Sequence, residues 1–150
     1  MPIVDGEEIL EVTANQLDEI IFNINYGAIT YRSLQPTTTA LFSLQTVTAS
    51  TAAQSIGVYT GNNAKMSVTF SQTGTSTNCT MNLYGSDHED LSLPGIFATC
   101  NLGASGDPVR FAIDPIAIPV YTFAEIVNGD AVNSAIGTIE ITTWQEPVEP

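Results

Sequence analysis

Hydrophobic and polar residues alternate with a period of two along most of the chain after residue 20. In the clearest case, Met66, Val68 and Phe70 are separated by serine and threonine. The same alternation recurs at Cys79, Met81 and Leu83, at Val109, Phe111 and Ile113, and at Ile139 and Ile141. A period of two is typical of β-strands that turn one face toward a core. These hydrophobic side chains are therefore predicted to point inward.

Further strands are expected between clusters of glycine, asparagine, aspartate and serine that favour turns. The segments are 20–25, 28–34, 40–48, 56–60, 95–101 and 117–127. Because no helices of about 10–15 residues separate these strands, the pattern favours antiparallel sheets. Eight or more strands in about 130 residues fit a jelly roll better than a seven-stranded immunoglobulin fold. The predicted fold is an all-β antiparallel sandwich of the jelly-roll type.

The two ends of the chain differ from this pattern. Thr13-Ala14-Asn15-Gln16 matches a helix capping box, although a strand beginning at Glu19 explains the region equally well. Gln145–Pro150 contains too much proline for a sheet or helix. We therefore predict an N-terminal arm over 1–19 with room for a short helix, a sandwich domain over 20–144 and an extended acidic tail over 145–150.

Composition fits one globular domain, since 43% of the 150 residues are hydrophobic and only 13% are charged. The net charge is −13, because sixteen acidic residues stand against Arg32, Lys65 and Arg110. Acids are absent from 21–86, so acidic ends flank a nearly neutral middle. Proteins that bind nucleic acid or anionic membranes need many basic side chains to meet phosphates. The charge balance excludes both kinds of partner.

The sequence shows no apolar run of the ~18 residues that a membrane span needs, and no basic, then apolar, signal peptide. We therefore expect a complete cytoplasmic product, or one released when a cell lyses. In that setting Cys79 and Cys100 are predicted to be small core residues and not a disulfide.

Few residues suggest catalysis. The single histidine, His88, lies in Asp87-His88-Glu89-Asp90, which could hold a divalent cation but is also typical of a solvated acidic loop. No Gly-x-Ser-x-Gly motif is present. A glycosidase would need two facing carboxylates, and the candidates for such a pair are Asp107, Asp114, Glu125 and Glu140. Because residues 87–150 hold ten acidic residues, a candidate pair arises easily by chance and is weak evidence for catalysis. We therefore predict no enzyme and no cofactor.

A binding module is the alternative to a purely structural protein. Sandwich domains that bind sugars present exposed aromatic side chains, and the candidates are Tyr26, Tyr31, Tyr59, Tyr84, Tyr121 and Trp144. Since most of these lie on predicted strands, core packing explains them as well. The alternative function is a glycan- or protein-binding module.

Residues 107–143 carry a resemblance to a known family. Asp107-Pro108-Val109-Arg110-Phe111 is followed by Ile118-Pro119-Val120-Tyr121, by Glu125-Ile126-Val127-Asn128 and by Gly137-Thr138-Ile139-Glu140-Ile141-Thr142. This stretch, about a quarter of the chain, is similar to the C-terminal strands of jelly-roll decoration (cement) proteins of tailed-bacteriophage capsids. The resemblance implies a structural protein without catalysis, made in the host cytoplasm, that sits on the capsid surface of the virion. It also implies a homotrimer that binds the major capsid protein and stabilises capsomer contacts. In a phage, the alternative glycan- or protein-binding module would belong to a fibre or spike.

The N-terminal arm is the predicted contact with such a partner. It mixes acidic with apolar side chains, as do segments that reach onto a neighbouring subunit or a basic surface. The predicted partner-binding residues are Ile3, Val4, Glu7, Glu8, Ile9, Leu10 and Glu11. Deleting residues 1–12 is expected to abolish or sharply weaken capsid association.

Overall fold

The computed structural model describes residues 35–104 and 106–145, which belong to the second of the two units of the chain, Met1–Ser33 and Leu34–Pro150. The strands are β2 (Pro36–Val47), β3 (Ala52–Gln54), β4 (Val58–Tyr59), β5 (Asn63–Gln72), β6 (Cys79–Ser86), β7 (Gly95–Leu102), β8 (Val109–Ile113), β9 (Tyr121–Asn128) and β10 (Ala135–Gln145). A short 3-10 helix, η1 (Pro115–Ala117), precedes β9. The expected helix after Thr13, the strands at 20–25 and 28–34 and the boundary at residue 19 lie outside the described residues.

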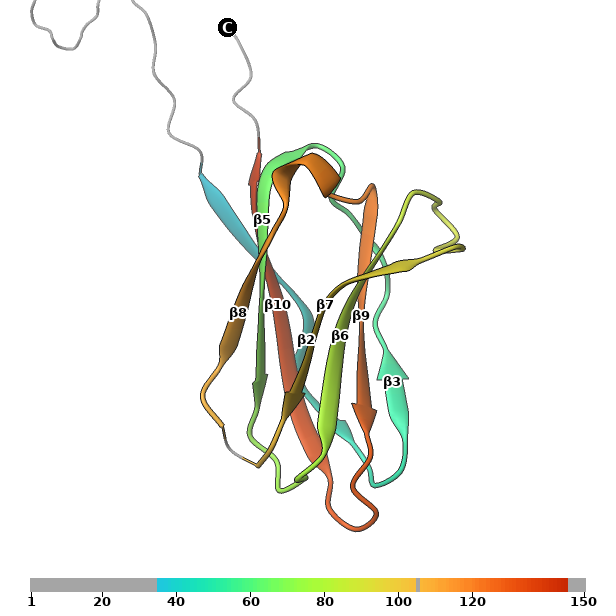
Figure 1. Cartoon of the computed structure of the whole chain (residues 1–150), viewed down its shortest axis with the longest axis vertical. Helices are drawn as coiled ribbons and strands as arrows, with labels where there is room; N and C mark the ends of the chain where they lie inside the picture. The colour runs from blue at the N-terminus through green and yellow to red at the C-terminus, as the bar shows by residue number, and fades with distance from the viewer. Residues whose placement is uncertain (1–34, 105, 146–150) are drawn as a thin grey trace, which may run out of the picture. The chain divides into compact units, whose positions relative to one another are not determined.

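The strands form two antiparallel sheets, in the orders β2–β10–β5–β8 and β3–β9–β6–β7, with β4 also paired to β9 (Figure 1). The pairing is nested: β2 pairs with β10, β3 and β4 with β9, β5 with β8, and β6 with β7. Such nesting arises when a long hairpin is wrapped across two sheets, and it is the topology of a jelly roll. The predicted all-β antiparallel sandwich is confirmed.

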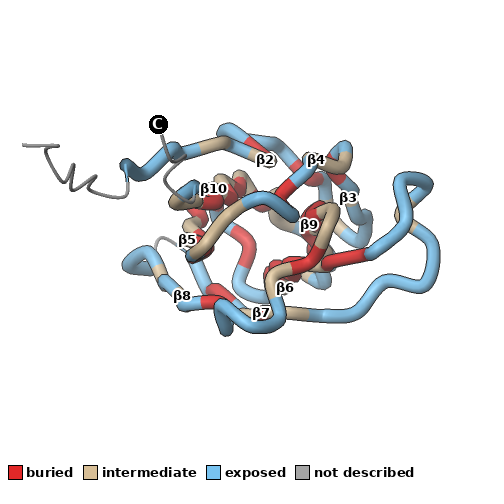
Figure 2. Tube along the Cα trace, turned by 90° about the horizontal axis from the view of Figure 1, so that it is seen from above, coloured by how far each residue is buried: buried red, intermediate tan, exposed pale blue. Residues whose placement is uncertain are grey.

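The core lies between the two sheets, where Figure 2 shows the buried residues gathered. The alternating hydrophobic residues of β5 and β6 point into it, and Met66, Val68 and Phe70 are at most 2% exposed. Cys79, Met81, Leu83, Ile139 and Ile141 are buried to the same degree. Val109 and Phe111 are only partly buried, because β8 is the edge strand of its sheet. The predicted inward faces are thus confirmed.

Two segments differ from the predicted strands. β3 was not expected, since Ala52-Ala53-Gln54 has no clear alternation; its pairing with β9 holds it in place, as does the hydrogen bond from the Ser55 N–H to the Ala124 carbonyl at 2.8 Å. The strand expected over 117–127 begins only at Tyr121. Pro115 and Pro119 flank the start of that segment, and proline cannot donate to a strand ladder.

Two buried amide side chains tie the sheets together at one end of the sandwich. Gln72 of β5 donates from Nε2 to the carbonyls of Leu102 at 3.2 Å and Gly103 at 2.9 Å. Asn128 of β9 donates from Nδ2 to the carbonyl of Val47 at the end of β2, also at 2.9 Å. The opposite end, where β8 and β10 finish, carries the pocket described next.

Candidate binding site

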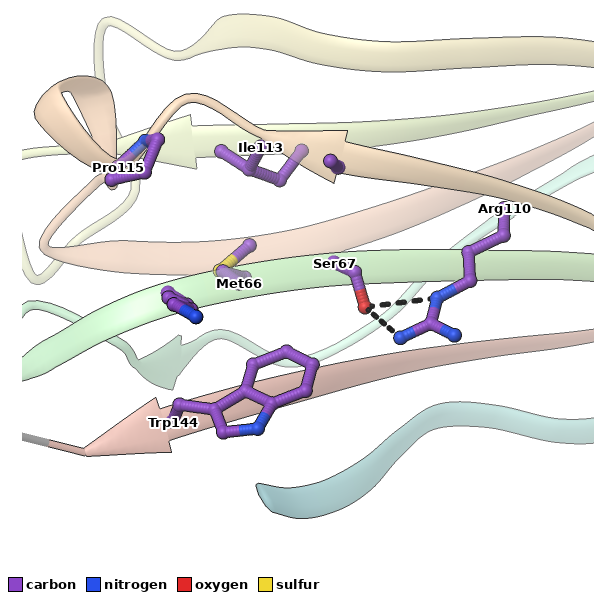
Figure 3. A pocket seen from close by; sticks show the side chains of 8 residues that line it. Met66, Ser67, Arg110, Ile113, Pro115 and Trp144 are labelled. Atoms are coloured by element: carbon purple, nitrogen blue, oxygen red, sulfur yellow. Dashed lines mark hydrogen bonds between the residues drawn. The ribbon is translucent and has the colours of Figure 1, made fainter. Parts of the chain in front are cut away.

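A pocket of about 610 Å³ opens on the outer face of the sheet β2–β10–β5–β8, near the ends of β8 and β10 (Figure 3). Pockets of roughly 300–1,000 Å³ are the usual size for small-molecule sites. The lining residues come from three neighbouring strands and from η1: Lys65, Met66, Ser67, Arg110, Ala112, Ile113, Pro115 and Trp144.

Strand register brings these side chains together although they are up to 79 positions apart in sequence. Trp144 of β10 is the pairing partner of Lys65 on β5, and Ala112 of β8 is the partner of Ser67 on β5. The residues between them along each strand, such as Met66, are buried in the core. Because side chains alternate along a strand, Lys65, Ser67, Ala112 and Trp144 share the outer face.

The 3-10 helix η1 forms the rim of the pocket. The carboxylate of Asp114 accepts a hydrogen bond from the backbone N–H of Ile116 at 3.0 Å and so caps the turn. Pro115 suits the first position of the helix because its φ is fixed and its missing N–H is not needed there. Since η1 follows β8 almost directly, the capped turn holds Pro115 beside Ile113 (Figure 3).

Arg110 is oriented by Ser67. The guanidinium donates to the Ser67 hydroxyl from Nε at 3.3 Å and from Nη2 at 3.2 Å, as the dashed lines in Figure 3 show. Ser67 is only 6% exposed, whereas Arg110 is exposed. A guanidinium has five N–H donors, so these two contacts leave donors for a ligand. Ser67 therefore holds the guanidinium of Arg110 in position and leaves its other N–H donors available to a ligand.

The charge of this site is opposite to that of the molecule. Lys65 and Arg110 are the two basic residues in the described part of the chain, and both line the pocket. The third basic residue, Arg32, lies outside that part. The whole chain has a net charge of −13, whereas the residues that line this pocket carry two positive charges and no carboxylate.

The acidic loop that contains His88 lies at the surface between β6 and β7. Asp87, His88 and Glu89 are exposed, and hydrogen bonds from Ser92 lower the pKa of Asp90 below its usual value. Within residues 35–104 and 106–145, no group of three or more histidine, cysteine or acidic side chains is placed to hold a metal ion. The solvated-loop interpretation fits this arrangement.

The candidate carboxylates are likewise separated. Glu125 and Glu140 alternate with core residues on β9 and β10 and so lie on the outer faces of opposite sheets. Glu125 Oε1 accepts hydrogen bonds from Asn82 Nδ2 at 3.2 Å and from the Tyr84 hydroxyl at 3.1 Å. Asp114 caps η1. The structure thus places Glu125 and Asp114 in local hydrogen bonds and does not bring Glu125 to Glu140.

Of the candidate aromatic side chains, Trp144 lines the pocket. Tyr84 stacks on Phe123 with ring centroids 5.1 Å apart, and its burial and its hydrogen bond to Glu125 raise its pKa. Tyr59 meets Tyr121 edge to face, with centroids 5.6 Å apart. Tyr26 and Tyr31 lie outside the described residues.

The two cysteines are free thiols, as predicted. Cys79 is fully buried on β6, and Cys100 on β7 is partly buried. Burial and the neighbouring Cys100 raise the pKa of Cys79 to about 11. Neither thiol is therefore activated as a nucleophile.

Sequence reasoning missed the pocket itself. Trp144 was a candidate, but Lys65 and Arg110 were noted only as rare cations. The one available signal was their scarcity, since Arg110 lies within a stretch of period-two alternation and Lys65 directly precedes another. The predicted arm residues, Ile3 to Glu11, lie outside the described part of the chain. Among the described residues, none of the helical structure is long and apolar enough to cross a lipid bilayer.

Fold and site together define a jelly-roll domain with a ligand-sized pocket on the outer face of one sheet. No protein-family model matches the chain, and no curated protein has a similar sequence. Among solved structures, the PBSX exported protein XepA is similar over 76% of this chain, with a TM-score of 0.55 and 15% sequence identity. This chain spans 39% of the length of XepA. At that identity the likeness shows a shared β-sandwich fold.

Two further structures are similar at lower scores. PirA matches with a TM-score of 0.41 and 11% identity, covering 78% of this chain and 99% of PirA. The mitogen of Yersinia pseudotuberculosis matches with a TM-score of 0.42 and 10% identity, covering 79% of this chain and 92% of the mitogen.

Proposed function

We propose that this chain is a non-catalytic binding module of a bacteriophage structural protein, of the fibre or spike kind, and that the pocket at Trp144 is its binding site. The observation that carries this proposal is the pocket, which gathers the single tryptophan and both described cations on one face of an acidic molecule. A phage setting is supported by the fold shared with the PBSX exported protein XepA. It is supported also by the resemblance of residues 107–143 to capsid decoration proteins.

The lining of the pocket favours binding over catalysis. Its residues include no histidine, cysteine or carboxylate, and acid–base or nucleophilic catalysis commonly depends on such groups. Ser67 is the one hydroxyl among them, and its oxygen accepts two hydrogen bonds from Arg110. A serine nucleophile needs instead a base that takes its proton.

The experiment that tests this proposal is binding of the labelled full chain to an array of glycans and to phage particles. We expect Trp144→Ala to weaken binding at least about tenfold, because large aromatic anchors dominate such sites. Tyr59→Ala is the matched control, since Tyr59 is 58% exposed and belongs to the opposite sheet. Absence of any ligand, or equal loss in both variants, would contradict the proposal.

Capsid decoration is the second candidate, and a different surface favours it. Exposed hydrophobic side chains gather around the sheet β3–β9–β6–β7: Ile56 after β3, Leu93 before β7 and Ile96 within β7 are 81%, 83% and 58% exposed. The two loops meet, because a Cβ built on Gly57 would lie 2.7 Å from Leu91. Exposed apolar patches mark protein contacts. The major capsid protein or a second copy of this chain would be the partner there, at the virion surface.

One substitution distinguishes the binding module from the capsid decoration protein. Ile96→Asp places a charge on the apolar surface, and Ile96 belongs to the sheet that contributes no residue to the pocket. If the chain is a decoration protein, this variant loses capsid co-sedimentation while Trp144→Ala retains it. The opposite pattern supports the binding module.

A further inference from the structure

The polar atoms that line the pocket are almost all hydrogen-bond donors. Lys65 contributes an ammonium group, Arg110 a guanidinium and Trp144 an indole N–H, and none of these can accept a hydrogen bond. The lining residues include no carboxylate or amide side chain, which neutral sugars use as acceptors for their hydroxyl protons. A site made of donors suits a ligand that is rich in acceptor oxygens.

Charge selects an anionic ligand. The two cations of the lining attract a compact anion. The nearby acids are Asp114, which lies between the lining residues Ile113 and Pro115, and Glu140, which is in register with Arg110 through Thr69. Arginine recognises planar carboxylates by parallel N–H donors, and Ser67 holds this guanidinium in place before a ligand arrives. Holding a side chain in its bound position lowers the entropy cost of binding.

The rest of the lining is apolar and fits a ring. Trp144 offers a flat indole face, Ile113 and Pro115 lie across β5 from it (Figure 3), and Ala112 completes the apolar lining. Aromatic rings stack on flat, weakly polar surfaces such as the C–H face of a sugar ring. The ligand therefore combines a carboxylate with a compact ring.

An acidic peptide fits this position less well than a sugar. Peptides that bind to sheets gain affinity by pairing their backbone with an exposed strand edge. Here Lys65 and Ser67 lie on β5, whose backbone is paired with β10 on one side and β8 on the other. Of the strands that line the pocket, β8 is the edge strand among the described residues, and its free edge faces away from β5. A peptide paired there would lie on the side away from Lys65 and Trp144, so the pocket itself favours a ring over a strand.

From these observations we propose that the pocket binds a carboxylated sugar unit of an acidic glycan, of the uronic or sialic acid type. The carboxylate accepts hydrogen bonds from Arg110, Lys65 adds positive charge, and the ring packs on Trp144. This inference rests on the proposed binding function and narrows its ligand to acidic sugars.

The test follows the indole N–H signal of Trp144 by NMR in the full chain, since a single tryptophan gives a single indole signal. Glucuronate and N-acetylneuraminate are titrated at constant ionic strength up to roughly ten millimolar, the range of weak single-site ligands. The methyl ester of glucuronate is the matched neutral ligand, acetate supplies a carboxylate without a ring, and a short polyglutamate represents acidic peptides.

We expect a saturable shift with at least one acidic sugar, and binding about tenfold weaker for the matched ester, as the loss of a charged hydrogen bond predicts. Arg110→Gln should weaken binding of the acidic sugar by a similar factor and leave the affinity for the ester unchanged. Tyr59→Ala should change neither affinity. Backbone spectra of each variant verify that it is folded.

Three results would overturn the inference. They are equal affinity for acid and ester, no effect of Arg110→Gln, and tighter binding of polyglutamate than of either sugar. Each of these is distinct from failure of the proposed function, which is the absence of any glycan or particle ligand that depends on Trp144. If the protein binds only neutral glycans, and this binding depends on Trp144, the proposed binding function is supported and the proposed acidic-sugar ligand is contradicted.

Discussion

The charge of Asp130 organises a turn of the structure through several hydrogen bonds. It follows Asn128-Gly129 in the turn between β9 and β10. Its carboxylate accepts hydrogen bonds from the backbone N–H groups of Asn133 at 3.0 Å, Thr77 at 2.9 Å and Val132 at 2.9 Å. These bonds favour the ionised form and hold the pKa of Asp130 far below its usual value. One charge thus joins the β9–β10 turn to the chain just before β6.

This lowered pKa gives a pH dependence of stability. Because the folded pKa lies below the unfolded one, the contribution of Asp130 is fully present above about pH 4 and is lost as pH falls below it. Asp130→Asn should therefore melt at a lower temperature than wild type at pH 7, and the difference should shrink as the pH drops below about 4. Thermal melts across pH measure this. The exposed Asp87→Asn serves as control, and a difference that does not vary with pH would contradict the prediction.

The two thiols should react at very different rates. Cys79 is fully buried and its pKa is raised to about 11, so almost no thiolate exists near pH 8. In native protein, a disulfide reagent should titrate Cys100 slowly and reach Cys79 only on unfolding. Counting released thiolate in Cys100→Ser protein isolates the buried site. A fast reaction of that variant would show that β6 opens readily.

At the scale of elements, two glycines report how closely neighbouring segments pass. A Cβ at Gly74, between β5 and β6, would lie 2.6 Å from the Ile136 nitrogen and 2.7 Å from the Ser134 oxygen, both backbone atoms. A Cβ at Gly137 on β10 would meet Ile126 Cδ1 at 2.6 Å and Met81 Cε at 2.8 Å, which are ends of flexible side chains.

Alanine should therefore be tolerated unequally. Gly74→Ala must move backbone and is expected to cost about 1–3 kcal/mol of unfolding free energy or more. Gly137→Ala should cost less, because the Ile126 and Met81 side chains can change rotamer. Urea unfolding of the two variants gives the comparison. A larger loss for Gly137→Ala would mean that the core, and not the β5–β6 turn, is the less adaptable region.

Strands were predictable where packing repeats along the sequence. The inward residues of β5, β6 and β10 follow a strict period of two, which reports burial directly. β3 has no such period, because its residues are held by pairing to β9 and not by their own pattern. The start of β9 was misplaced since Ile116, Ile118 and Val120 resemble a strand, while the cap from Asp114 and two prolines impose a turn.

The pocket was not predictable from local patterns, because it depends on register between strands far apart in sequence. Lys65 and Trp144 are paired in the sheet, but nothing near either residue specifies which strand lies beside it. Register is fixed by the whole hydrophobic pattern and by the turns. From residue types alone, Trp144 could be identified as a candidate aromatic side chain. Its proximity to Arg110 could not be predicted.

For the whole molecule, the mass in solution separates the remaining alternatives. A trimer near three times the chain mass of 15.9 kDa supports the decoration hypothesis, in which copies meet at three-fold positions. Light scattering of wild type and Ile96→Asp measures this mass. If Ile56, Leu93 and Ile96 form the contact between copies, the substitution yields monomers; a trimer that survives it places the contact elsewhere. Loss of capsid association on deletion of residues 1–12 stays a separate prediction for the N-terminal arm.

The position of β10 has a consequence for how this protein is made. β10 is the last strand in sequence, and it lies between β2 and β5, pairing with both along most of its length. On the ribosome, the first sheet lacks this central strand until residue 145 has left the exit tunnel. Until then β2 lacks β10, its one partner among the described residues, and exposes the hydrogen-bonding groups that β10 would pair, a state open to aggregation or to capture by chaperones. Folding of this jelly roll is therefore completed after translation of β10, however early the other strands form.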